Sequence, residues 1–364
     1  MILWCLFMKE KISYNIHDIV KIEMSRIKKL ELLRDLNLRF TYFEVDSVKN
    51  PDIILNLGPF KPENKNCTII DHKFYIKDNY FYCKESEENA KWEVEIFGIE
   101  KGQMVVNFNE KVSRIQRFLA PNIISQHFML RNLIEWKLFQ KGALMLHVGS
   151  VENNGKAYLF AGRGGALKTT IIMNLIREKK FNYIGDEYVI IYKGKIWSFP
   201  AAFQEFLFRF ENLPTENLRK ERRFRDILSW FFYLRKHSNL ENYKKPIIKV
   251  SDNAKLNSIF FINRGAGNSI KKANYSLENV ARKMLMNTRL EAINESVGGV
   301  AIQGNPFKYL LAYEQVFPRS DIANYWSELE NRYKNIFKNI QCYDVYMPLE
   351  YNKRFLEKIL KFIK

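Results

Sequence analysis

Residues 156–177 read KAYLFAGRGGALKTTIIMNLIR. The apolar run 158–161 is typical of a buried strand and leads directly into a glycine-rich segment, 162–167. After this segment, apolar residues recur at the spacing of a helix, at Ile171, Ile172, Leu175 and Ile176. A strand, a glycine-rich loop and a helix in this order are the setting of the Walker A pattern, GxxxxGK followed by Ser or Thr. The sequence therefore predicts a phosphate-binding loop.

The chemistry of this pattern explains which residues matter. Successive backbone N–H groups and the positive end of the helix dipole bind phosphate oxygens, a lysine reaches the outer phosphates, and a hydroxyl holds Mg²⁺. Lys168 and Thr169 occupy the lysine and hydroxyl positions. We therefore expect a site for a nucleoside triphosphate, with ATP and Mg²⁺ as cofactors. The residues expected to form it are Gly162, Arg163, Gly164, Gly165, Ala166, Leu167, Lys168, Thr169 and Thr170.

One position departs from the pattern, because Leu167 stands where the second glycine is expected. Glycine there tolerates backbone angles and a close approach that a β-carbon opposes. Gly164 and Gly165 lie inside the loop and can supply that freedom instead. We expect a distorted but usable loop with weak affinity. The simplest alternative is a glycine-rich turn between a strand and a helix that binds no phosphate.

A dinucleotide-binding loop is a second alternative. Gly162 and Gly164 match the first two glycines of GxGxxG, and Asp186 lies at about the right distance downstream for a ribose contact. The third glycine of that pattern would fall on Leu167. Under this interpretation, Lys168 and Thr169 would follow the loop by coincidence.

An acidic pair follows the next predicted strand. Residues 182–184 form that strand, Asp186 and Glu187 come at its end, and 188–192 is predicted as another strand. In a phosphoryl-transfer enzyme, one carboxylate at this place orders Mg²⁺ and another can accept the proton of the attacking hydroxyl. The alternative is an ordinary acidic turn.

The segments around the loop alternate between strand and helix patterns. Further strands are predicted at 143–148, 196–197, 258–262 and 343–346, and further helices at 277–290, 322–337 and 353–364. Asn153, Asn154 and Gly155 form a strong hairpin-turn signal before the loop strand. Upstream, we predict an amphipathic helix over 16–38, β-rich runs over 52–108 and a helix over 122–139.

Two domains are expected for a chain of 364 residues. The first is an N-terminal helix with a β-rich domain that ends in a helix, residues 1–142, and the second is the loop-bearing domain, 143–364. Within the second, 209–249 is a basic, aromatic insert with a net charge of +6, that is, eleven Lys or Arg against five acids. Its apolar centre is explained most simply by burial in a core or an interface.

Composition narrows the partners. The net charge is +18, from 58 Lys and Arg against 40 Asp and Glu, and favours anionic partners, although compositional bias alone can produce it. The four cysteines are scattered without a CxxC pair, which fits a reducing cytoplasm. The apolar run 1–8 is too short to span a bilayer and lacks the features of a signal peptide. We expect a cytoplasmic protein. Peripheral membrane contact and a homo-oligomer stay open.

Three stretches together resemble the catalytic domain of HPr kinase/phosphorylase and its relatives in the phosphoenolpyruvate carboxykinase-like fold. Those relatives carry a Leu-His-Ala-Ser-like strand, a hairpin, the phosphate loop and a downstream Asp-Asp pair. The matching stretches here are 146–151, 162–170 and 185–187. The resemblance implies an α/β protein with a P-loop nucleotide-binding domain of this type, and residues 50–142 look like the β-rich front half of its compact relatives.

The resemblance also implies roles. Lys168 and Thr169 would hold phosphate and metal. Of Asp186 and Glu187, one would bind the metal and the other would act as the general base. His147 would face the transferred phosphoryl group. It implies an ATP-dependent kinase acting on a hydroxyl of a peptide, a protein or a small molecule. Three departures are Leu167, Glu187 in place of a second Asp, and the lack of the family's downstream Glu-x-Arg-Gly stretch.

Two rivals to the kinase remain. A nucleotide-binding regulator or scaffold that has lost phosphoryl transfer is favoured by Leu167 and by the missing stretch. A nucleic-acid or membrane-surface binder would use the basic insert, but without an RNA-binding signature in the sequence we do not expect a nucleic-acid partner.

Overall fold

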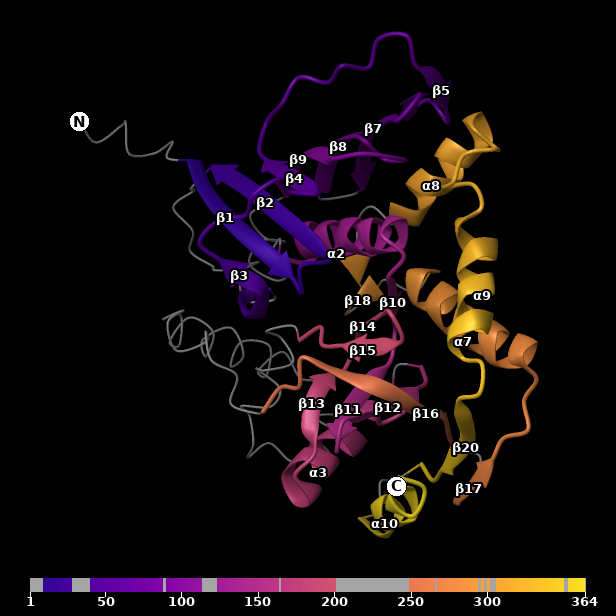
Figure 1. The fold of residues 1–364 in the computed structure, drawn as a ribbon. Coiled ribbons are helices and arrows are strands. Elements are labelled where there is room, and N and C mark those ends of the chain that lie inside the picture. Colours follow the sequence, from indigo (N-terminus) through magenta and orange to yellow (C-terminus); the bar gives the residue numbers. More distant parts are fainter. Residues whose placement is uncertain are drawn as a thin grey trace. The chain divides into compact units, whose positions relative to one another are not determined.

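The computed structural model describes residues 9–27, 40–87, 90–112, 123–163, 165–200, 249–265, 267–293, 296–297, 300–301, 306–349 and 353–363. The chain divides into two compact units, residues 1–142 with 292–328, and residues 143–291 with 329–364. Each unit contains one large mixed sheet, so the protein is of the mixed α/β class (Figure 1). Residues 292–328, predicted to lie in the second domain, cluster with the first unit instead.

In its described residues, the first unit is built on a nine-stranded sheet with the order β3-β1-β2-β4-β9-β8-β7-β6-β5. The β2–β4 and β4–β9 pairs are parallel, and the others are antiparallel. Alternate residues along the strands are buried, as Ile53 and Leu55 are in β4, which explains the β-rich pattern of this region. The strands are β1 (Lys9–Ile16), β2 (Val20–Ile27), β3 (Glu44–Val45), β4 (Ile53–Leu57), β5 (Thr68–Ile70), β6 (Phe74–Lys77), β7 (Tyr80–Glu87), β8 (Ala90–Phe97) and β9 (Met104–Val112).

The predicted helix over 16–38 is wrong where the structure describes it. Residues before and after His17 and Asp18 form the antiparallel hairpin β1–β2, and both turn residues have positive φ, 51° and 57°. Such turns match the twist of the strands that they join. Val20, Ile22 and Met24 are buried, so the apolar period is two rather than 3.6. Residues 28–38 lie outside the described part.

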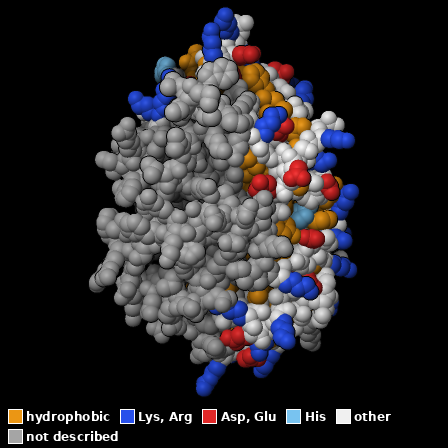
Figure 2. Space-filling model, turned by 90° about the vertical axis from the view of Figure 1, so that its left-hand side faces the viewer, with side chains coloured by type: hydrophobic (Ala, Val, Ile, Leu, Met, Phe, Trp, Pro, Cys, Tyr) orange, Lys and Arg blue, Asp and Glu red, His pale blue; other side chains and the backbone are white. Residues whose placement is uncertain are grey.

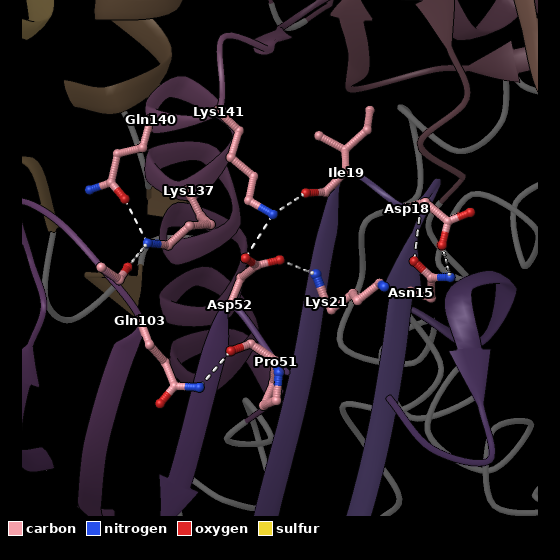
Figure 3. Close-up of polar contacts among 11 residues, drawn as sticks. Asn15, Asp18, Ile19, Lys21, Pro51, Asp52, Gln103, Lys137, Gln140 and Lys141 are labelled. Carbon is pink, nitrogen blue, oxygen red and sulfur yellow. Dashed lines mark hydrogen bonds and ion pairs between the residues drawn. The ribbon is translucent and has the colours of Figure 1, made fainter. Parts of the chain in front are cut away.

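The predicted helix over 122–139 is confirmed as α2 (Ile123–Gln140), which contacts β2 and β4. Its C-terminal end is fixed to the sheet by two lysines (Figure 3). Lys141 Nζ lies 2.7 Å from Asp52 Oδ1 and donates to the Ile19 carbonyl at 2.7 Å. Lys137 Nζ donates to the Gly102 carbonyl at 2.7 Å, and burial lowers its pKa to about 8. The first unit also contains the 3₁₀ turn η3 (Thr41–Phe43), the hairpin β18 (Ser296–Val297) and β19 (Val300–Ala301), and α8 (Pro306–Val316).

The second unit contains the other large sheet, whose main path is β10-β14-β15-β16-β12-β11-β13. A further strand, β20, pairs with β16 and β17. The β12–β16 and β16–β20 pairs are parallel, which brings the ends of three strands to one edge. The strands are β10 (Leu144–Leu146), β11 (Gly149–Asn153), β12 (Lys156–Ala161), β13 (Asn182–Gly185), β14 (Val189–Tyr192), β15 (Lys195–Trp197), β16 (Asn253–Arg264), β17 (Ser269–Lys272) and β20 (Gln341–Met347).

The helices of this unit follow the predicted positions. They are α3 (Lys168–Lys179), α7 (Leu277–Ile293), α9 (Tyr325–Ile336) and α10 (Lys353–Leu360), of which α7 and α9 each extend across a unit boundary. Residues of α3 and α10 share one apolar cluster with β12, β16 and β20, so the helix after the glycine-rich loop packs directly on the sheet. The hairpin predicted at 153–155 joins β11 to β12.

Two segments discussed in the sequence analysis lie outside the described part of the chain, and the described basic side chains do not gather on the face drawn in Figure 2. The basic insert 209–249, apart from its last residue, and the apolar run 1–8 lie outside the described residues. None of the helices in the described part of the chain has both the length and the apolar character needed to cross a membrane. Over the described part of the face drawn in Figure 2, Lys and Arg side chains are dispersed among Asp and Glu.

Candidate functional site

The glycine-rich loop joins the carboxyl end of β12 to the start of α3. A β-carbon on Gly162 would come 3.0 Å from the Ala166 Cβ and 3.1 Å from the Ile262 carbonyl oxygen, so glycine permits the close approach of the loop to β16. Gly165 has a φ of 82°, which favours glycine. Gly164 is not described.

Leu167 adopts the left-handed conformation, with φ 66° and ψ 24°, at the N-terminus of α3. This is the position where the Walker A pattern has its second glycine, and a left-handed leucine costs about 1–2 kcal/mol. Its side chain packs against the apolar cluster beneath α3, and its carbonyl accepts from the Ile171 N–H at 3.1 Å. The strain that the sequence predicts at this residue is therefore present, and apolar packing offsets part of it.

Lys168 begins α3, and its Nζ donates to the Gly162 carbonyl at 2.6 Å. The cation thus folds back over the loop rather than extending away from it. The first amides of any α-helix have no acceptor within the helix. The start of α3 therefore combines the backbone amides of a helix N-terminus, the positive end of the helix dipole and an ammonium group.

The acidic pair lies in a tight turn between β13 and β14. A β-carbon on Gly185 would come 2.3 Å from the Tyr188 carbonyl oxygen, so only glycine fits this turn. Asp186 follows and is 6% exposed, and its carboxyl group lies beside the Thr169 side chain. Within the described residues, Asp186 Oδ1 has no hydrogen-bond partner. Glu187 is half-buried.

The surroundings of Asp186 raise its pKa from 3.8 to about 6. Burial is the main cause, and the negative charge of Glu187 adds to it. The neighbouring Thr169 side chain and the charge of Lys168 oppose the rise. A buried, partly unsatisfied carboxylate beside a threonine hydroxyl is a suitable pair of oxygen ligands for a hard cation.

His147 follows β10 and is buried, and its ring meets the Tyr188 ring edge-on at 5.1 Å. The next strand, β11, begins at Gly149, whose missing side chain leaves room for α3. A β-carbon there would come 2.2 Å from Ile172 Cδ1 and 3.4 Å from Asp186 Oδ1. The structure therefore places the segment from His147 to Gly149 next to the acidic turn and the first turns of α3.

Two residues that sequence reasoning missed hold the loop in place. Arg264, at the end of β16, donates from Nη1 to the Gly165 carbonyl at 3.1 Å and from Nε to the Leu349 carbonyl at 2.9 Å. Asn287, in α7, accepts from Arg163 Nη1 at 3.1 Å through its carbonyl. Its side-chain amide donates to the His147 carbonyl at 2.8 Å. Helix α7 thus connects the loop with the His147 segment.

Arg264 could have been found from the sequence, since a cation that ends an apolar strand parallel to the loop strand lies at the loop's edge of the sheet. Asn287 gives no comparable signal in the middle of a helix. Comparison of the sequence with protein-family models and with curated proteins returns no match.

The site offers donors for an anion and oxygen ligands for a cation. In the described part of the chain, no group of three or more His, Cys, Asp or Glu is placed to hold a metal ion. A cation at Thr169 and Asp186 would therefore take its other ligands from water or from a bound phosphate. Mg²⁺ binds in this way, through one or two carboxylates and substrate phosphates.

Proposed function

We propose that this chain binds Mg·ATP at residues 162–170 and transfers the terminal phosphoryl group to a hydroxyl of a peptide, a protein or a small molecule. The proposed fold of the second unit is that of HPr kinase and phosphoenolpyruvate carboxykinase. The observation that carries the proposal is the position of the buried Asp186 carboxyl group beside Thr169. This position brings together the hydroxyl of the phosphate-loop pattern and the acidic pair that the same chemistry requires.

Each residue has a role in this proposal. Lys168, with the first amides of α3, binds the outer phosphates, and Arg264 holds the loop from β16. Thr169 and Asp186 hold Mg²⁺, which neutralises phosphate charge when bound. Glu187 accepts the proton of the acceptor hydroxyl.

The transfer itself is a displacement at phosphorus. The acceptor oxygen forms a bond to the terminal phosphorus while the bond from that phosphorus to the bridging oxygen of ADP breaks. The residues of the site contribute mainly by positioning the reactants and by electrostatic stabilisation. His147, whose ring lies against Tyr188, faces the transferred group in this scheme.

The burial of Asp186 favours this function over dinucleotide binding. A carboxylate that binds a ribose hydroxyl has to be accessible beside the loop, whereas Asp186 is only 6% exposed. A preparation that binds NAD but not ATP would reverse this choice.

Calorimetry with Mg·ATP tests the loop. Lys168→Ala should weaken binding and abolish turnover, because it removes the mobile cation from the outer phosphates. Lys179→Ala is the matched control, since Lys179 ends the same helix and pairs with Glu357 at 2.8 Å. Equal affinity in the wild type and in Lys168→Ala would refute the assignment.

A regulator that binds ATP without transferring phosphate is the second candidate, favoured by the left-handed Leu167. Incubation with γ-labelled ATP, Mg²⁺ and candidate hydroxyl compounds separates the two. Label in an acceptor supports the kinase. Nucleotide binding with no transfer to any acceptor supports the regulator.

A further inference from the structure

A basic pocket lies at the end of the second sheet opposite to the glycine-rich loop. Its volume is about 770 Å³, within the usual range for small-molecule sites. Lys156 begins β12, and the loop follows the sixth and last residue of that strand. At about 3.3 Å per residue, the pocket and the loop are roughly 20 Å apart along β12.

Five lysines from separate segments line this pocket. They come from the starts of β12 and β16, the end of β17 and the turns after α9 and α10, and these elements can be followed in Figure 1. The five lysines are Lys156, Lys255, Lys272, Lys338 and Lys361. The described lining contains no carboxylate. Among the described residues, Lys255, Lys272, Lys338 and Lys361 form no ion pair.

The charge of the pocket can be estimated from its components. The four lysines that form no ion pair with a described residue contribute four positive charges, and the carboxyl ends of α9 and α10 contribute about half a negative charge each. The sum is about +3. The lysines are solvent-exposed, so solvent and salt weaken their mutual repulsion, but their charges add up to a positive potential that attracts an anion.

Polar and aromatic residues complete the lining. Gln341 accepts a hydrogen bond from the Tyr343 hydroxyl at 2.7 Å through its Oε1, which leaves its amide hydrogens to donate elsewhere. The Tyr343 ring stacks on Phe260 at 5.0 Å and meets Phe362 at 5.1 Å. Two ring contacts therefore hold Tyr343 in the lining, and the ammonium and amide donors of the lining match an oxygen-rich anion.

We propose that this pocket binds a small oligophosphate, a ligand with three or more phosphate charges, independently of the glycine-rich loop. A pocket of this size suits a compact ligand better than a nucleic-acid strand, which needs an extended groove. The same phosphate chemistry could belong to a polyphosphate or to a phosphorylated metabolite.

Tripolyphosphate is the probe, and Lys168→Ala serves as the parent protein so that the loop contributes little. Calorimetry should show binding that weakens as salt rises from about 50 to 200 mM, as expected for contacts between charges. Lys255→Gln with Lys272→Gln should weaken it at least tenfold. Lys271→Gln is the matched control, because Lys271 precedes Lys272 on β17 and lies outside the lining.

The outcomes decide the proposal. Inorganic phosphate should bind at least tenfold more weakly than tripolyphosphate. Thermal melting without ligand should show the double variant folded and no less stable than its parent, since charge repulsion is removed. No binding to the parent, equal loss in the Lys271→Gln control, or much tighter binding of a single-stranded oligonucleotide would each overturn it.

Discussion

Replacing Leu167 by alanine and by glycine separates the two effects that act on this residue. Alanine removes the apolar packing but keeps the β-carbon, and therefore the cost of the left-handed conformation, about 1–2 kcal/mol. Glycine removes both. Because Leu167 is only partly buried, the lost packing costs about 1–2 kcal/mol, below the range for fully buried leucines.

The expected order of stability follows. Glycine loses about 0.5–1 kcal/mol relative to alanine in an ordinary helix, through its freedom in the unfolded chain. At Leu167, relief of the left-handed cost should outweigh this, and the glycine variant should be about 0.5–1 kcal/mol more stable than the alanine variant. The wild type should be the most stable of the three.

Urea unfolding of the three proteins measures this order of stability, and calorimetry with Mg·ATP measures how tightly the loop of each protein binds the nucleotide. The glycine variant should bind the nucleotide more tightly than the wild type, because its backbone can adapt to the phosphates. An alanine variant more stable than the glycine variant would show that Leu167 is not left-handed. Unchanged or weaker binding by the glycine variant would refute the idea that the β-carbon limits affinity.

The remaining predictions concern the acidic turn and its support. Asp186→Asn should raise the Mg²⁺ requirement, whereas Glu187→Gln should lower turnover by about 10²–10⁴-fold with little effect on binding; unaffected transfer in both variants would exclude these roles. Because the pKa of Asp186 is raised to about 6, the stability that its protonated form contributes is present below 3.8 and is lost as pH rises through 6. In EDTA, the melting temperature of Asp186→Asn should therefore exceed that of the wild type at pH 8, whereas the two should be equal near pH 3.5. A difference that does not change with pH would contradict the raised pKa. Gly149→Ala should lower the free energy of unfolding by about 1–3 kcal/mol, because the new β-carbon meets Ile172. Adding Ile172→Val to this variant should recover part of the loss in thermal melts. If the losses of the two substitutions simply add, the contact is not the cause.

Local patterns in the sequence predicted much of the second unit. The run 158–192 carries its strand, loop and helix signals within short distances, and each of these elements appears in the structure. The left-handed conformation of Leu167 was also foreseeable, because the Walker A pattern requires glycine there for a steric reason. The binding of ATP, the metal and the transfer stay predictions.

Long-range pairing and short hairpins were harder to predict. The apolar spacing predicts a helix where the structure has the hairpin β1–β2, because neither His17 nor Asp18 is a strong turn residue of the Asn-Gly kind. The contacts of Asn287 with Arg163 and His147 join segments more than a hundred residues apart, and periodicity in the sequence says nothing about such pairs.

The division of the chain has a consequence for its biosynthesis. The first unit includes residues 292–328, which follow the main segment of the second unit in the sequence. Tyr309, in this stretch, is buried, and its ring lies 4.7 Å from that of Phe81. At about 5–20 residues per second, a ribosome needs roughly 8–30 s to reach Tyr309 after completing residue 142. Until then, the apolar surface that Tyr309 covers is exposed to chaperones and to other nascent chains. No single cut can release either unit whole, and a fragment that ends at Gly142 should aggregate.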